Sequence, residues 1–122
     1  MENGSLRVAL VVLASPETHE GLGRVVNGLQ LARELRENGD DVVLVFDGAG
    51  TVAAAAALDP EQPMSRLFAI VRDRVVGACA FCAGALGVQE FLEASGIPLL
   101  AEFHQHPSLR HWLRAGYRMV TC

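Results

Sequence analysis

Uninterrupted apolar runs alternate along the chain with segments whose apolar residues recur at helical spacing. Residues 7–14, RVALVVLA, form one such run, which is rich in valine and does not alternate polar and apolar positions. Runs of this kind are typical of strands that are buried on both faces of a parallel sheet. Similar runs at 41–48, 75–81, 98–103 and 117–122 bring the expected strands to five.

The segments between these runs predict helices. The apolar residues after Leu22 are spaced for one helix face, and that helix is expected to end at Asn38-Gly39, where glycine can take the left-handed cap conformation. Further helices are expected at 51–58, 64–71, 85–96 and 107–116. Strands that alternate with helices predict one α/β domain over residues 1–122, with three layers, α/β/α, around a parallel sheet of about five strands, flavodoxin-like in outline.

This order of elements also predicts where a site would lie. In open parallel sheets, ligands bind beyond the carboxyl ends of the strands. The residues expected at those ends are Ser15 to His19, Asp47-Gly48, Cys79 to Cys82, Phe103 to His106, and Cys122. Both cysteines of the sequence Cys79-Ala-Phe-Cys82 are therefore expected on the side of the sheet that holds a site.

Composition narrows the class of protein. Apolar residues make up 51% and charged residues 20% of the 122 residues, as in a globular chain with one core. The formal net charge is −4 and no basic run is present, so nucleic acid is not expected as a ligand. The N-terminal segment lacks the features of a signal peptide and its apolar run is too short to span a membrane, so we expect a cytoplasmic protein. Three cysteines, an odd number, argue against a disulfide framework.

Two familiar motifs match only in part. Gly21-Leu-Gly23 lacks the third glycine of a dinucleotide fingerprint, because Val26 stands in its place. A Cys-x-x-Cys pair between a strand and a helix is the arrangement of a thioredoxin-like redox site. Here, however, Pro98 follows Cys82 too closely for a thioredoxin order of elements, and the pair lacks the usual Gly-Pro between its cysteines.

Two further interpretations of the cysteines stay open. Cys79, Cys82, His104 and His106 could converge above adjacent strands, and cysteine with histidine is a ligand set that suits zinc, although His-x-His is not a standard structural spacing. Alternatively, Cys79 is simply a small buried apolar residue in a strand. The site would then belong to a non-catalytic module that binds a small ligand or a metal, or that serves only as a subunit.

The segment CAFCAGALGV, which begins at Cys79, resembles the DsrE/DsrF/TusD-like family. That family places a cysteine at the end of the third strand, with glycine and then valine or isoleucine eight and nine positions later, and Gly87 and Val88 match this pattern. The resemblance covers nearly the whole chain. Two positions depart from it, because Leu86 stands where the family often has arginine, and Cys82 is an addition.

The resemblance implies a DsrE/F-like fold and a sulfur-carrier or sulfurtransferase-type function. Cys79 would accept sulfane sulfur as a persulfide, and Cys82 would be a resolving or assisting thiol. The resemblance implies no cofactor or metal. It does imply a homo-oligomer (dimer, trimer or hexamer) and partner proteins that donate and accept sulfur.

Simple chemistry adds three expectations. A thiol at a helix N-terminus sees the positive end of the helix dipole, which would lower the pKa of Cys79 enough that no general base is required. His104 or His106 is a weaker candidate for handling protons. Cys122 ends the last strand, two or more strands from Cys79, so a disulfide between them is not expected: strands are about 4.8 Å apart and a disulfide needs Cα atoms within about 7 Å.

Overall fold

Five parallel strands form the centre of the structure, a computed structural model that describes residues 5–122. The strands are β1 (Arg7–Val12), β2 (Asp41–Phe46), β3 (Val75–Cys79), β4 (Leu99–Leu100) and β5 (Arg118–Thr121). They lie in the order β4-β3-β2-β1-β5, and each neighbouring pair is parallel. The predicted parallel sheet of about five strands is therefore confirmed. Residues 1–4, which the expected domain includes, lie outside the described residues.

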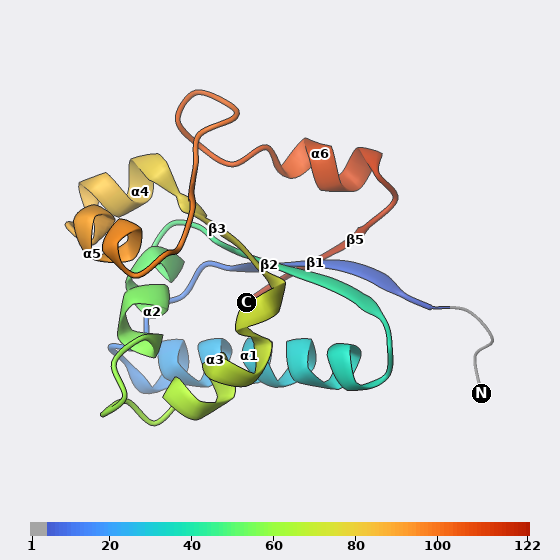
Figure 1. Cartoon of the computed structure of the whole chain (residues 1–122), viewed down its shortest axis with the longest axis horizontal. Coiled ribbons are helices and arrows are strands. Elements are labelled where there is room, and N and C mark those ends of the chain that lie inside the picture. The colour runs from blue at the N-terminus through green and yellow to red at the C-terminus, as the bar shows by residue number, and fades with distance from the viewer. Residues whose placement is uncertain (1–4) are drawn as a thin grey trace.

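Helices cover both faces of this sheet. They are α1 (His19–Glu37), α2 (Gly50–Ala57), α3 (Ser65–Val71), α4 (Ala80–Ala85), α5 (Gln89–Ala94) and α6 (Leu109–Arg114), with a 3-10 turn, η1, at Arg72–Arg74. The helices α1, α2 and α3 lie on one face and α6 lies on the other, which gives the three predicted layers (Figure 1). None of the helices within residues 5–122 has the length and apolar character needed to cross a membrane.

The main core lies between the sheet and α1 to α3. Val8, Leu10 and Val12 alternate along β1 toward this core, where they join Val25 and Leu29 of α1. All five side chains are buried. Full burial of such a side chain stabilises the fold by roughly 1.5–3 kcal/mol. This core holds β1, β2 and β3 in register, so their carboxyl ends lie side by side at one edge of the sheet.

One expected element was wrong. The helix predicted for 85–96 was placed too early: the structure has α5 at Gln89–Ala94, and a separate short helix, α4, begins directly after Cys79 and ends at Ala85. Gly87 adopts a φ of 76°, its N–H donates to the carbonyl of Gly84, and the N–H of Val88 donates to that of Ala83. This pair of hydrogen bonds is the Schellman motif at a helix C-terminus, which favours glycine at the position that Gly87 occupies. The spacing of eight positions from Cys79 to Gly87 therefore spans one short helix, from its N-cap to the glycine that ends it.

The fourth strand is also shorter than predicted. The run 98–103 forms only the two strand residues of β4, and the chain then turns back on itself between Phe103 and His106, which exchange two backbone hydrogen bonds. The two residues between them, His104 and Gln105, have φ values of 49° and 71°. Two consecutive positive φ values are the signature of a tight type I′ turn. In Figure 1 this segment is part of the loop that rises between β4 and α6.

Candidate functional site

Cys79 lies at the junction of β3 and α4, as the sequence predicts. Its backbone is extended, with φ −58° and ψ 122°, and its Sγ accepts a hydrogen bond from the N–H of Cys82 at 3.4 Å. The thiol therefore serves as the N-cap of α4, a position usually taken by an oxygen-bearing side chain. The residue is 0% exposed. Its sulfur is thus held in one position, beneath the turn that follows β4.

His106 approaches the same sulfur from that turn. Its Nδ1 lies 3.2 Å from the Sγ of Cys79, which is hydrogen-bond distance for a thiol and an imidazole. Two contacts keep the turn in place: the N–H of Phe81 donates to the carbonyl of Gln105 at 2.9 Å, and the rings of Phe81 and His106 pack with centroids 5.1 Å apart. The turn after β4 therefore brings an imidazole to the buried thiol.

Cys82 and Asp47 complete the cluster. Cys82 lies in the first turn of α4, half-buried, and its Sγ lies 3.6 Å from Oδ1 of Asp47. Asp47 directly follows β2, the neighbour of β3, and the same oxygen accepts the N–H of Gly48 at 2.8 Å. One donor atom each from Asp47, Cys79, Cys82 and His106 lies within 4.8 Å of the others. We call these four residues the thiol cluster.

The electrostatic setting of Cys79 differs from the expectation. Burial raises the pKa of the Cys79 thiol to about 12, and the N–H of Cys82 offsets this only in part, while the nearby charge of Asp47 adds to it. The expected lowering by the helix dipole was wrong, because α4 has only six residues and the sulfur is removed from water. The Cys79 thiol therefore keeps its proton at neutral pH.

The structure brings together three of the residues that the sequence singled out and separates two others. Cys79, Cys82 and His106 meet, whereas His104 is exposed on the outside of the turn, with its ring against Phe103 at 4.4 Å. Cys122 lies on β5's side of the sheet, three positions from β3 in the strand order, which agrees with the expectation that it cannot bridge Cys79. All three cysteines are free thiols.

Asp47 is the member of the thiol cluster whose role the sequence did not indicate. It was expected only at the carboxyl end of the second strand, without a partner. The signal that could have found it is the sheet order, because β2 and β3 are neighbours and their carboxyl ends share one edge. Ordering β2 beside β3 is what brings the Asp47 carboxylate to Cys82.

The raised pKa of Cys79 predicts a loss of stability in alkaline solution. An unfolded thiol ionises near its ordinary pKa of about 8.5, whereas folded Cys79 keeps its proton up to a pKa of about 12. Between these values the folded state binds more protons than the unfolded state, so stability falls as pH rises, by up to about 1.4 kcal/mol per pH unit. Urea unfolding from about pH 8 to pH 10.5 measures this, and Cys79→Ala should lose less stability over the range. Parallel curves for the two proteins would contradict the assignment.

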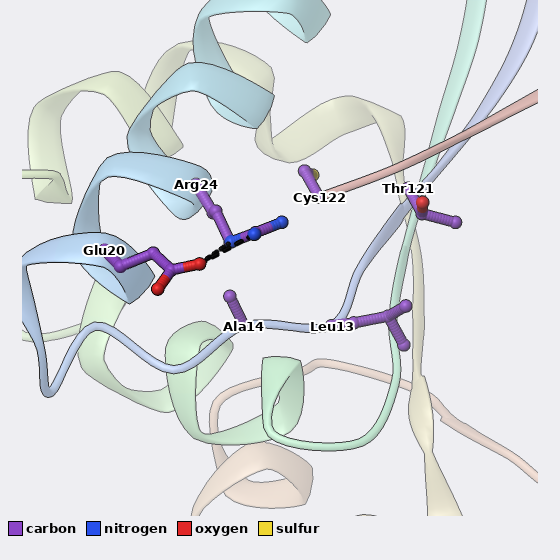
Figure 2. Close-up of a pocket in the computed structure, with 6 residues that line it drawn as sticks. All are labelled: Leu13, Ala14, Glu20, Arg24, Thr121 and Cys122. Carbon is purple, nitrogen blue, oxygen red and sulfur yellow. Dashed lines mark hydrogen bonds and ion pairs between the residues drawn. The ribbon is translucent and has the colours of Figure 1, made fainter.

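A separate hollow of about 340 Å³ lies at the carboxyl ends of β1 and β5. It is lined by Leu13, Ala14, Glu20, Arg24, Thr121 and Cys122 (Figure 2). Arg24 pairs with Glu20 at 2.7 Å, and burial raises the pKa of Cys122, which the charge of Arg24 partly opposes. A Cβ on Gly28 of α1 would lie 2.4 Å from the Cys122 sulfur. Cys122 therefore packs against α1, where the missing side chain of Gly28 leaves it room.

Comparison with known proteins gives one family, one sequence relative and two solved structures of the same fold. The model of the DsrE/DsrF-like family matches residues 7–122. The uncharacterized protein MJ0733 from Methanocaldococcus jannaschii is 27% identical over 121 residues, which is 98% of each chain. Two solved structures share the fold. The YchN protein from E. coli has a TM-score of 0.65 at 22% identity and covers 96% of this chain and 99% of its own.

The second structure is the conserved protein of unknown function BT1422 from Bacteroides thetaiotaomicron. It has a TM-score of 0.62 at 14% identity, and the match covers 93% of this chain and 94% of that protein. At these identities the two structures show that the α/β arrangement is shared. The predicted fold is therefore confirmed both by the sheet itself and by its neighbours.

Proposed function

Because the chain belongs to the DsrE/DsrF-like family, we propose that it carries sulfane sulfur, accepted as a persulfide on Cys79 and passed to an acceptor. Membership of this family suggests sulfur relay. The observation that supports the assignment most is the 3.2 Å approach of His106 Nδ1 to the Cys79 sulfur. A buried thiol paired with an imidazole has the parts that nucleophilic attack on sulfur requires.

Cys79 then accepts the sulfur in one displacement step. The Cys79 sulfur attacks the terminal sulfur of a donor persulfide, R–S–SH, while the Cys79 proton moves to His106 Nδ1. The S–S bond of the donor breaks, and its thiolate leaves and takes up a proton. The products are R–SH and a persulfide, S–SH, on Cys79. His106 supplies the base that a thiol with a pKa of about 12 needs at neutral pH.

Cys82 is proposed as the assisting thiol. It lies three residues from Cys79, its N–H already bonds the Cys79 sulfur, and unlike Cys79 it is partly exposed. Its thiol can attack the inner sulfur of the Cys79 persulfide. Hydrosulfide then leaves, and a Cys79–Cys82 disulfide forms that a reductant must open before the next cycle. By this route the sulfur leaves as hydrosulfide, so it is a side route to the transfer of sulfane sulfur from Cys79 to an acceptor thiol.

Access to Cys79 requires the tip of the turn, His104 and Gln105, to move while His106 stays beside the sulfur. This turn covers the fully buried sulfur and is attached by the hydrogen bond from Phe81 to Gln105. Both central residues of the turn have positive φ values, a conformation that costs an ordinary side chain roughly 1–2 kcal/mol. Opening at Gln105 therefore breaks the hydrogen bond from Phe81 and releases local strain. A donor protein that engages the turn would gain access to the thiol.

Intact mass spectrometry after incubation with a small persulfide donor tests this function. The wild-type chain is expected to gain the mass of one sulfur atom, and a thiol reductant should remove it. The sample should first be reduced and checked for three free thiols, so that prior oxidation does not hide the reaction. A folded, fully reduced chain that gains no sulfur from the donor would exclude the carrier function.

We also expect the chain to form a homo-oligomer, as a dimer, trimer or hexamer. Large apolar side chains are exposed around the thiol cluster, on α4, α5 and the turn after β4: Phe81, Leu86, Phe91 and Phe103. Phe103 is 63% and Phe81 56% exposed, which leaves apolar surface to cover. Light scattering at micromolar concentration measures the mass. A sharp monomer mass across that range would contradict the prediction.

A further inference from the structure

The thiol cluster also has the composition of a metal site. Asp47, Cys79, Cys82 and His106 offer one carboxylate oxygen, two sulfurs and one imidazole nitrogen, and these four atoms lie within 4.8 Å of one another. Zinc binds in this way, tetrahedrally, with bonds of about 2.3 Å to sulfur and about 2.0–2.2 Å to nitrogen and oxygen. Mixed sulfur and nitrogen ligands favour zinc over magnesium or calcium, which prefer oxygen alone.

The spacing of the donor atoms fits such an ion. Two ligands of a tetrahedral zinc ion are separated by roughly 3.3–3.8 Å, given those bond lengths. Cys79 Sγ and His106 Nδ1 are 3.2 Å apart, and Cys82 Sγ and Asp47 Oδ1 are 3.6 Å apart. These two separations are close to those of a tetrahedral site, and since all four atoms lie within 4.8 Å of one another, the farthest pairs would close by about 1 Å around an ion.

The surroundings support the ligands in the way that metal sites require. The N–H of Cys82 points at the Cys79 sulfur at 3.4 Å, and the N–H of Gly48 donates to Asp47 Oδ1 at 2.8 Å. Backbone donors of this kind orient ligands and stabilise their charged forms. The ligands come from the ends of β2 and β3, from α4 and from the turn after β4, so an ion would tie the turn to the sheet.

We propose that Asp47, Cys79, Cys82 and His106 together bind one zinc ion per chain. Binding releases the two thiol protons to solvent and leaves the ion held by two thiolates, one carboxylate and a neutral imidazole. This set differs from the one that the sequence suggested, since Asp47 replaces His104. The inference goes beyond the proposed sulfur chemistry and does not depend on it, although a zinc ion on Cys79 would exclude a persulfide there.

Cobalt(II) titration of the reduced, chelator-treated full chain tests the proposal. Tetrahedral cobalt with thiolate ligands gives intense visible bands and a near-ultraviolet charge-transfer band. We expect these bands to saturate at one cobalt per chain and to disappear when zinc is added. Asp47→Ala, Cys82→Ser and His106→Ala should each weaken binding by at least about tenfold, since each removes one ligand.

His104→Ala and Cys122→Ser are the matched controls, because neither residue belongs to the thiol cluster. Both should keep the wild-type spectrum and stoichiometry, and circular dichroism should show that every variant is folded. Absence of tetrahedral cobalt bands in the wild type would overturn the proposal. So would equal losses for His104→Ala and His106→Ala. Cobalt binding without sulfur acceptance would refute only the carrier function, and sulfur acceptance without cobalt binding would refute only the metal site.

Discussion

Cys79→Ser is expected to abolish the stable sulfur adduct completely, whereas wild type forms it with a small persulfide donor. Serine keeps the N-cap of α4, because its oxygen can accept the N–H of Cys82 in place of the sulfur. The helix should therefore persist while the nucleophile is lost. Intact mass spectrometry measures the adduct, and far-ultraviolet circular dichroism shows that the fold is retained.

Cys82→Ser is expected to give the opposite result. Without the assisting thiol, the Cys79 persulfide cannot be resolved into a Cys79–Cys82 disulfide, so transfer of the sulfur should slow or the adduct should last longer. Both variants should be measured under reducing and oxidising conditions, because that disulfide can mask the adduct. Cys122→Ser provides the control, since Cys122 packs against α1 away from the thiol cluster. An adduct that survives Cys79→Ser but disappears in Cys82→Ser would move the nucleophile to Cys82.

The parallel sheet could be predicted because its strands are buried on both faces. Runs such as 7–14 and 41–48 contain almost no polar residues, and that pattern belongs to a sheet covered by helices. The start of the 85–96 helix was predicted too early, and α4 was missed, because the apolar residues continue across Gly87 without marking where one helix ends and the next begins. The Schellman ending depends on a backbone conformation that the apolar pattern does not record.

The sequence could predict only that the site lies where several strands end, not which side chains meet there. The sequence places Cys79 and Cys82 at the correct edge, but the approach of His106 depends on a tight turn built from His104 and Gln105, two residues that rarely take positive φ values. The choice between His104 and His106 could not be made without that turn. The same holds for the pKa of Cys79, since the depth of burial outweighs the helix terminus and is a property of the folded chain.

Close packing of α2 against β1 makes Gly50 the glycine whose replacement should cost most. Gly50 is the first residue of α2, and a Cβ there would lie 1.8 Å from the carbonyl oxygen of Val12 and 2.6 Å from its carbon. Those atoms are backbone at the carboxyl end of β1, an interior strand of the sheet, and the same carbonyl accepts the N–H of Asp47. The strand cannot yield without disturbing the loop that carries Asp47 to the thiol cluster.

Gly50→Ala is therefore expected to lower the free energy of unfolding by more than about 3 kcal/mol, beyond the usual cost of overpacking. Gly23→Ala is the matched control. Gly23 lies within α1, and a Cβ there meets nothing within 4 Å, so alanine should stabilise the helix by roughly 0.5–1 kcal/mol. Urea unfolding followed by circular dichroism compares the three proteins. If Gly50→Ala were as stable as wild type, α2 would have to begin farther from β1, and Asp47 would no longer be held beside Cys82.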